Sequence, residues 1–134
     1  MKRLLLAAFF ITSLSLPALA ADKANTVLIH KGETVYARFE TKGKKMKLVG
    51  FAKEKDERAQ VIFSFLPDPK KPELILKVEN KFTQDLSYKA EMRSLTKKMK
   101  FLVPVSPVVG GKVSFESFPN QVEEVAAFEF QLEQ

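Results

Sequence analysis

Apolar and polar residues alternate with a period of two along most of this 134-residue chain after its first twenty residues. The clearest run is 85–93, whose apolar members fall at every second position: Leu86, Tyr88, Ala90 and Met92. Successive side chains of a strand point to opposite sides, so these four share one face and the polar residues share the other. The pattern predicts strands with one face in a core and one in water.

The same alternation marks the other expected strands, which are 26–29, 34–40, 45–51, 61–66, 74–79, 100–105, 112–118 and 126–133. Turn signals separate them, at Lys31-Gly32, Lys42-Gly43, 67–72, Gly110-Gly111 and Pro119-Asn120. The stretches 53–58 and 92–100 lack an apolar stripe and are interpreted as loops or single turns. Eight or nine short strands predict an all-β protein, an antiparallel β-sandwich, with a small β-barrel as the alternative.

Several short motifs near the C-terminus are similar to those of small uncharacterised secreted β-sandwich proteins of Gram-negative bacteria. They are Asn80, Leu86-Ser87-Tyr88-Lys89-Ala90, Pro104-Val105, Gly110-Gly111 and Glu116 near Pro119. The spacing of Asp85, Tyr88 and Ala90 also resembles the tyrosine corner of immunoglobulin-like domains, with Ala90 in place of the antibody cysteine. The resemblance implies an immunoglobulin-like fold and no particular activity. The alternative is that Tyr88 is an ordinary core aromatic.

The N-terminus has the layout of a secretory signal peptide. Lys2 and Arg3 precede an apolar stretch at 4–16, and small residues stand at Ala18 and Ala20. The apolar stretch is shorter than the roughly 20 residues that a membrane span needs. We expect cleavage after residue 20, which leaves 21–134 as a single domain in the periplasm or secreted beyond it. An uncleaved anchor or a buried first helix is the alternative.

Composition excludes several chemistries. The chain has no cysteine, which removes disulfides, thiolate catalysis and cysteine-ligated zinc. Its one histidine, His30, cannot build a site that needs two imidazoles, and a copper site with separated methionines has no clustered motif behind it. Ser94 and Lys97 have the spacing of penicillin-recognising enzymes, but the partner motifs are missing. The sequence predicts no enzyme activity, no cofactor and no metal.

Charge is unevenly distributed. The formal charge of +6 falls to +4 without Lys2 and Arg3, and residues 113–134 hold five acidic and no basic side chains. The basic residues that form the densest groups are Lys42, Lys44, Lys45 and Lys47, followed by Lys97, Lys98 and Lys100. If they converge, they suit anionic envelope surfaces such as lipopolysaccharide or anionic phospholipid. The alternative is a solvated face with charged edge strands that prevent aggregation. Export argues against nucleic acid as a partner.

Three functions remain open. The first is a non-catalytic periplasmic module that engages an envelope protein through its loops or an edge strand, since loops on a rigid scaffold commonly carry recognition. The loop residues expected to make this contact are Pro67, Asp68, Pro69, Pro72, Pro107, Gly110 and Gly111. The second is a binder of anionic surfaces through the lysines. The third is a carrier of a small apolar ligand, suggested by the many phenylalanines. We favour the first, for a protein that is not embedded in the membrane.

Overall fold

The computed structural model describes residues 25–133, and within them every regular element is a strand. The nine strands are β1 (Val27–His30), β2 (Glu33–Lys42), β3 (Lys45–Ala52), β4 (Val61–Pro67), β5 (Glu73–Asn80), β6 (Leu86–Ser94), β7 (Met99–Val103), β8 (Val113–Pro119) and β9 (Glu124–Leu132). Each begins and ends within two residues of an expected strand. The all-β prediction is confirmed, because local alternation is a strong signal when one face of each strand is buried.

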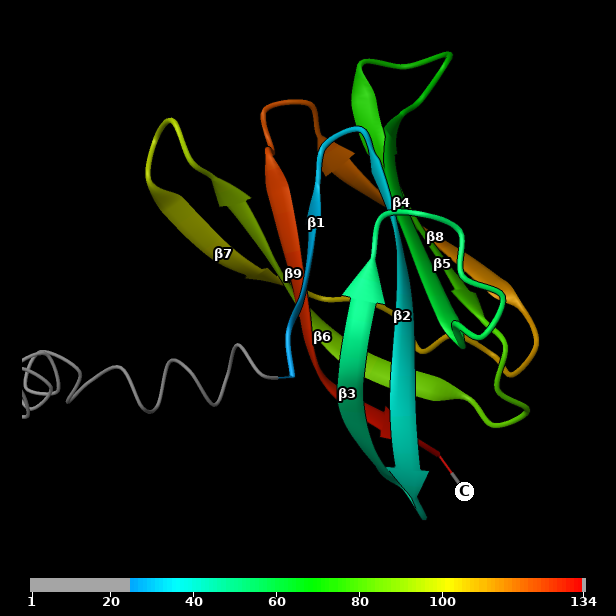
Figure 1. Ribbon diagram of the computed structural model, residues 1–134. Helices are drawn as coiled ribbons and strands as arrows, with labels where there is room; N and C mark the ends of the chain where they lie inside the picture. The colour runs from blue at the N-terminus through cyan, green and yellow to red at the C-terminus, as the bar shows by residue number, and fades with distance from the viewer. Residues whose placement is uncertain (1–24, 134) are drawn as a thin grey trace, which may run out of the picture.

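All strand pairs are antiparallel, and the strands form one sheet in the order β7-β6-β9-β3-β2-β4-β5-β8. β9 pairs with β6 along one side, while its other side pairs with β1 in its first half and with β3 at Gln131. The sheet curls around its core-facing side into an open half-barrel (Figure 1). β7 and β8 are the two ends of this sheet and do not pair with each other.

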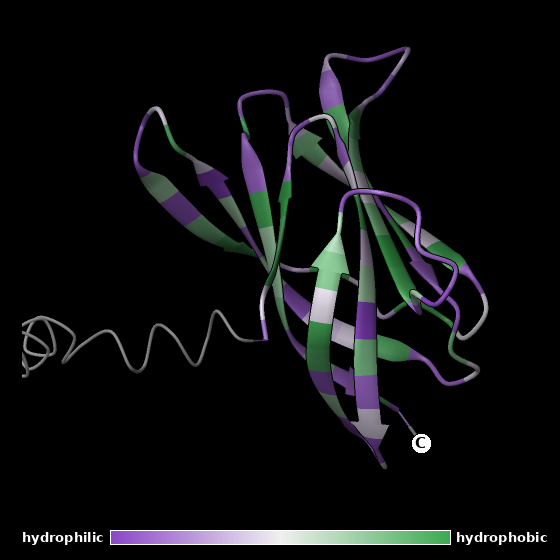
Figure 2. Ribbon diagram, viewed as in Figure 1, coloured by the Kyte–Doolittle hydropathy of each residue, from purple (hydrophilic) through white to green (hydrophobic). Residues whose placement is uncertain are grey.

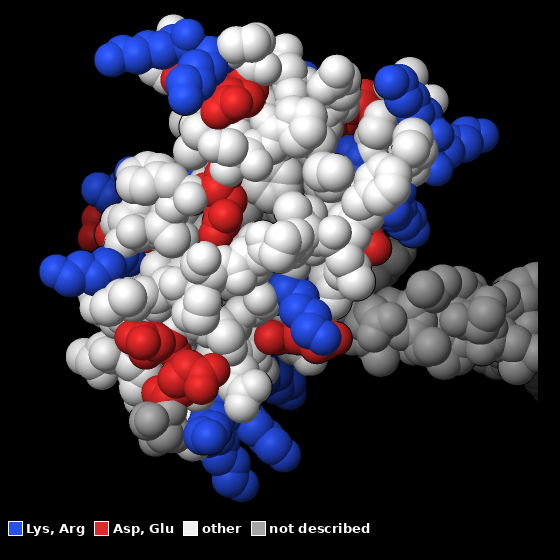
Figure 3. All heavy atoms as spheres, turned by 180° about the vertical axis from the view of Figure 1, so that it is seen from behind, with Lys and Arg blue, Asp and Glu red and all other residues white. Residues whose placement is uncertain are grey.

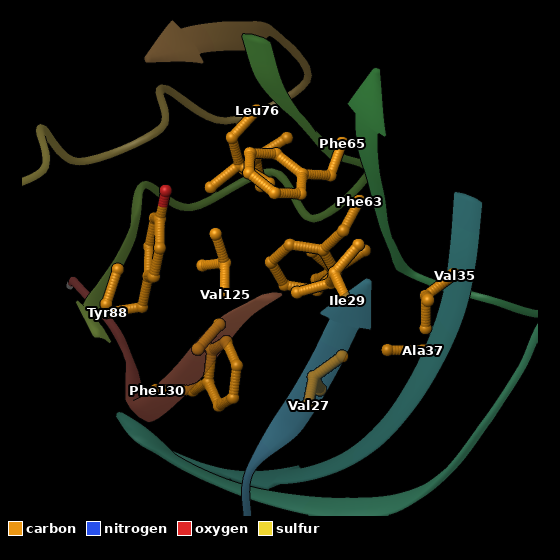
Figure 4. Packing of buried hydrophobic residues seen from close by; sticks show 14 of the residues in the cluster. Val27, Ile29, Val35, Ala37, Phe63, Phe65, Leu76, Tyr88, Val125 and Phe130 are labelled. Atoms are coloured by element: carbon orange, nitrogen blue, oxygen red, sulfur yellow. The ribbon is translucent and has the colours of Figure 1, made fainter. Parts of the chain in front are cut away.

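The core lies inside the curl and is built from the alternate residues that the sequence pattern marks. Aromatic rings meet edge to face there, with centroid distances of 4.9 Å between Phe39 and Phe130 and 5.5 Å between Phe65 and Phe118. Valine, isoleucine and leucine side chains from β1, β2 and β5 fill the space around them (Figure 4). Because the core draws on strands from both ends of the chain, no half of the sequence contains a complete core.

Two irregularities bend the sheet. The register between β2 and β3 shifts between Arg38 and Phe39, and the register between β6 and β9 shifts between Ser87 and Lys89. Opposite the second shift, Glu129 has a φ of 52°, an uncommon backbone conformation for a residue other than glycine. Bulges of this kind increase the local twist and bend the strand. They help a single sheet to curl around its own core.

The segment 104–112 crosses from β7 to β8, behind β3 and β2 in the view of Figure 1. Val108 is buried, and it exchanges backbone hydrogen bonds of 2.8 and 2.9 Å with Leu86 at the start of β6. The side chain of Asn80, which is 1% exposed, donates hydrogen bonds to the carbonyl oxygens of Val108 and Gln84 and accepts one from the amide of Phe82. The segment is therefore part of the folded body.

The stretch 92–100, interpreted as a loop or single turn, is a hairpin in which β6 reaches Ser94 and β7 begins at Met99. The expected signal peptide at 1–20 lies outside the described residues. Within the described part of the chain, no helix has the length and apolar character to cross a membrane.

Candidate interaction surface on the β6–β7 hairpin

The β6–β7 hairpin projects from the body of the molecule (Figure 1, left). β7 pairs with β6 from Ala90↔Val103 to Ser94↔Met99, and no other described strand pairs with it. One side of β7 therefore presents unpaired backbone N–H and C=O groups, which is the usual condition of an edge strand. A free edge of this kind is a template on which another strand can add.

Large apolar side chains are exposed along this hairpin. Phe101 is 47% exposed and Leu102 is 68% exposed, and Met99 and Leu95 are exposed as well. Figure 2 shows hydrophobic and hydrophilic positions in turn along the hairpin. Single exposed apolar residues are normal on a protein surface, but a contiguous group is typical of a binding site. Edge strands are commonly protected by charges or bulges, and within β7 only Lys100 is charged.

The two faces of β7 differ. Phe101 lies opposite Met92, which in turn lies opposite the fully buried Val125, so Phe101 stands on the core-facing side of the sheet. Met99 shares that side because it is two residues away. The strands on the opposite side of the curled sheet leave Met99 and Phe101 exposed. Lys100 and Leu102 stand on the convex side.

An ionic network fixes the outer half of the hairpin, close to its turn, to the start of β9. Arg93 of β6 contacts Glu124 at 2.8 Å through Nη1 and Glu91 at 2.8 Å through Nε. Glu124, only 5% exposed, also contacts His30 Nε2 at 2.9 Å. His30 Nδ1 lies 3.1 Å from Glu33, whose other carboxylate oxygen lies 2.8 Å from Lys53 Nζ. Buried carboxylates need such partners, and Glu124 has two.

The charge states in this network follow from its contacts. Burial alone lowers the pKa of Arg93, but hydrogen bonds and attraction from Glu91 and Glu124 raise it by more, so the guanidinium stays charged. Burial alone raises the pKa of Glu33, while hydrogen bonds from Lys53 and His30 lower it by more, and its pKa ends below the usual value. The cluster thus holds paired charges that orient the hairpin. Among the described residues, no group of three or more His, Cys, Asp or Glu side chains is placed to hold a metal ion.

The tip of the hairpin is tied to the loop between β8 and β9. Glu123 accepts hydrogen bonds of 2.8 Å from the backbone amide and from the hydroxyl of Thr96. These hydrogen bonds lower the pKa of Glu123. Glu123 and Glu124 point to different partners, as expected for neighbours at the start of a strand. Together they position the turn of the hairpin and the strand residue Arg93 beside it.

The two groups of predicted lysines lie on two different hairpins. Lys42, Lys44, Lys45 and Lys47 surround the β2–β3 turn, whereas Lys97, Lys98 and Lys100 belong to the β6–β7 hairpin. The two hairpin tips point to opposite ends of the molecule (Figure 1). Seen from behind, positive side chains lie in several separate groups, with uncharged surface and acidic side chains between them (Figure 3). The fold therefore does not bring the two groups together.

The predicted contact loops also differ from each other. Pro67, Pro69 and Pro72 are exposed in and beside the β4–β5 turn, where Asp68 accepts a hydrogen bond from the amide of Lys70. In the other loop, Pro107 is exposed, but Gly110 donates its amide to Asp85 Oδ1 and Gly111 donates to the carbonyl of Phe82. The β4–β5 turn is thus accessible, and the glycines of the second loop hold the body together.

Tyr88 is a core aromatic. Its ring lies 6.2 Å from Phe130 and 6.3 Å from Phe63 between centroids. Its buried hydroxyl has no hydrogen-bond partner among the described residues, so the hydrogen bond of a tyrosine corner is not formed. Burial, and to a lesser degree the negative charge of Glu116, raises the pKa of Tyr88. The spacing around Tyr88 resembled the corner because a buried strand places its aromatics at the same alternate positions.

Two shallow depressions mark the surface, and both are open to solvent. One lies along the β2–β3 hairpin and is lined by Glu40, Thr41, Lys42, Lys45, Met46 and Lys47. The other lies between β6 and the segment after β7, lined by Tyr88, Lys89, Leu102, Val103, Pro104 and Val105. Neither is an enclosed cavity of the type that holds a small apolar ligand.

The comparisons with known proteins add no assignment. No protein-family model, no curated protein and no solved structure matches this chain. The role of the β6–β7 hairpin surface therefore follows from its own residues. Sequence reasoning had singled out the lysines of this hairpin and missed Phe101 and Leu102. The signal was present in the three consecutive apolar residues 101–103, which break the strict alternation of a strand with one wet face.

Proposed function

We propose that this chain is a non-catalytic binding module of the bacterial periplasm that engages an envelope protein by strand addition at β7. The observation that carries the proposal is the free edge of β7 with Met99, Phe101 and Leu102 exposed on its two faces. Strand addition derives affinity from main-chain hydrogen bonds and specificity from the alternate side chains. A preformed, firmly anchored edge favours this mode, because little order has to be gained on binding.

The opposite end of the sheet offers a comparison. β8 is also an edge strand, and its Phe115 is 65% exposed. However, the inner face of β8 belongs to the body, where Phe118 is buried and Glu116 accepts a hydrogen bond from the amide of Ser106. On β7, only Val103 packs against the core, while Met99 and Phe101 on the core-facing side and Leu102 on the convex side are exposed. For this reason we assign the partner to β7.

The test compares matched variants of the two exposed phenylalanines. Phe101→Ser and Phe115→Ser each remove an exposed aromatic from an edge strand, so both are expected to fold and to keep their melting temperature within a few degrees. A photo-crosslinking residue at position 100 identifies the periplasmic partner in living cells. We expect the crosslinked product to disappear in Phe101→Ser and to persist in Phe115→Ser. Equal yields from both variants contradict the assignment.

The proposal extends to the layering of the fold and to the location of the protein. The sheet order supports an immunoglobulin-like description in which β7-β6-β9-β1 forms one layer and β3-β2-β4-β5-β8 the other, since the two layers share the single residue pair Lys45↔Gln131. The expected signal peptide supports a periplasmic location. Both agree with a small accessory module.

A second candidate is anionic-surface binding by the β2–β3 hairpin. Lys42 and Lys45 lie directly opposite each other in the register, and like charges in that position are unfavourable unless an anion is near. Binding to vesicles that contain phosphatidylglycerol, weakened by salt and by Lys42→Ser and Lys45→Ser, is the result this candidate requires.

A further inference from the structure

We infer that the segment added to β7 is an extended peptide in which acidic and apolar residues alternate, an inference that rests on the proposed strand addition. The hairpin segment 93–103 contains Arg93, Lys97, Lys98 and Lys100 and no acidic residue. Charge of one sign on an interaction surface selects a partner of the opposite sign and repels the others. The chemistry of the hairpin therefore points to an acidic strand.

Most of this positive charge is available to a partner. The charge of Arg93 is compensated within the body by Glu91 and Glu124. In the part of the chain that the structure describes, Lys97, Lys98 and Lys100 have no carboxylate within 4.0 Å. Lys100 lies directly opposite Arg93 on β6, so two positive side chains share the convex face of the hairpin. An acidic side chain on the far side of Lys100 supplies the opposite charge that Arg93 already has and Lys100 lacks.

The alternation of β7 fixes the alternation of its partner. Lys100 is on the convex face, while Met99 and Phe101 are on the core-facing side. Cross-strand neighbours share a face, so a strand added to β7 places a side chain beside Lys100 on the convex face and its two neighbours on the core-facing side. An acidic residue fits the position beside Lys100. Apolar residues fit the two positions on the core-facing side, where they continue the core beyond Phe101.

Two other occupants fit less well. Lipid does not satisfy the unpaired backbone groups of β7, and open sheet edges do not occur within the hydrocarbon region of a bilayer. A second copy of the chain that pairs β7 with β7 brings two sets of Lys97, Lys98 and Lys100 together, which is repulsive. A strand with alternating acidic and apolar residues forms hydrogen bonds with the backbone of β7, covers its exposed apolar side chains and neutralises the lysines of the hairpin.

The experiment measures the affinity of the full mature chain for three ten-residue peptides, in which valine alternates with glutamate, with serine or with lysine. We expect the Val–Glu peptide to bind about tenfold or more tightly than the Val–Ser peptide and the Val–Lys peptide not to bind. Added salt weakens the Val–Glu complex. Lys100→Ser lowers its affinity about two- to fivefold. The matched control Lys44→Ser, on the distant β2–β3 turn, leaves the affinity unchanged.

The possible outcomes separate this inference from the proposed function. Equal binding of all three peptides, with loss in Phe101→Ser, keeps strand addition and overturns the acidic partner. Tight binding of the Val–Glu peptide that Phe101→Ser does not weaken places the site elsewhere and overturns both. Failure of every peptide to bind overturns the inference, while the crosslink from position 100 still decides the proposed function. A stable dimer, or binding to phosphatidylglycerol vesicles lost in Phe101→Ser, also overturns it.

Discussion

Gly110 occupies a place where the fold leaves no room for a side chain. A Cβ atom at this position would overlap the backbone carbonyl of Thr83, and its own amide is bound to Asp85. A backbone obstacle cannot rotate away as a flexible side chain can. The crossing of 104–112 against the β5–β6 turn therefore depends on glycine at this residue.

We predict that Gly110→Ala lowers the free energy of unfolding by about 3 kcal/mol or more, because the segment must move away from Thr83. Urea denaturation followed by circular dichroism measures the change. Gly50→Ala is the control, since a Cβ there meets nothing within 4 Å and the backbone has no positive φ. A Gly110→Ala variant as stable as Gly50→Ala contradicts the close approach.

Asn80 performs a second residue-scale task, which is to satisfy buried backbone groups where β5 ends. We predict that Asn80→Ala costs about 2–3 kcal/mol of unfolding free energy, because the carbonyl of Val108 and the amide of Phe82 lose buried partners. Asn80→Asp removes the two N–H donors of the side chain and is expected to be no more stable than Asn80→Ala. Asn120→Ala, at an exposed turn, serves as the control in the same denaturation series, and equal effects at the two positions speak against this role.

At the scale of the element, the β6–β7 hairpin depends on contacts that its own sequence does not contain. An isolated two-stranded hairpin is marginally stable in water. Here Glu123 and Glu124, some thirty positions along the chain, hold Thr96 and Arg93. The segment 92–100 suggested a loop because it lacks an apolar stripe, and the acidic pair that orders it is distant in sequence.

These contacts predict a pH dependence. The pKa of Glu123, like that of Glu33, lies below the usual value of 4.5 in the folded chain, so its stabilisation is present above pH 4.5 and is lost as the pH falls through the folded pKa. Urea midpoints measured from pH 6 to pH 2 should fall. In Glu123→Gln the fall should be smaller, and the midpoint near neutral pH should be lower. An unchanged slope in Glu123→Gln excludes Glu123 as a contributor.

At the scale of the whole molecule, the fold joins the two ends of the described chain and places β7 and β8 at the ends of the continuous strand order. β1 pairs with β9, while β7 and β8 terminate the sheet. Because the pairs β1–β9, β6–β9 and β5–β8 join strands that are not neighbours in the sequence, the core forms only when the sheet as a whole has curled. We propose a partner for β7, which exposes large apolar side chains on both of its faces.

The expected export of the molecule is tested by mass. When the full gene product is made in a Gram-negative host, we predict a periplasmic form that begins at Ala21. Intact-mass spectrometry of the osmotic-shock fraction measures this directly. A full-length mass, or a product that stays in the cytosol, contradicts the signal peptide and removes the support for a periplasmic partner.

The sequence by itself determined which residues are extended and, where the alternation is regular, which of them face the core. The run 85–93 became β6 because a strand's side chains alternate strictly, so burial of one face leaves a local record. In 126–133 the expected core face of Ala126, Phe128, Phe130 and Leu132 is wrong in its first half, because the bulge at Glu129 places Ala127 rather than Ala126 and Phe128 in the core. It also determined the absence of thiols and the presence of one imidazole. These properties are local, and counting residues recovers them.

Tertiary structure alone decided which strands became edges, and that the lysines around Lys44 and those around Lys98 lie at opposite ends. It also decided that Arg93, His30 and Glu124 meet, from β6, β1 and β9. Backbone pairing is nearly independent of side-chain identity, so alternation fixes the faces of a strand but not its neighbours. The exposed edge at Phe101 arises from that choice of neighbours.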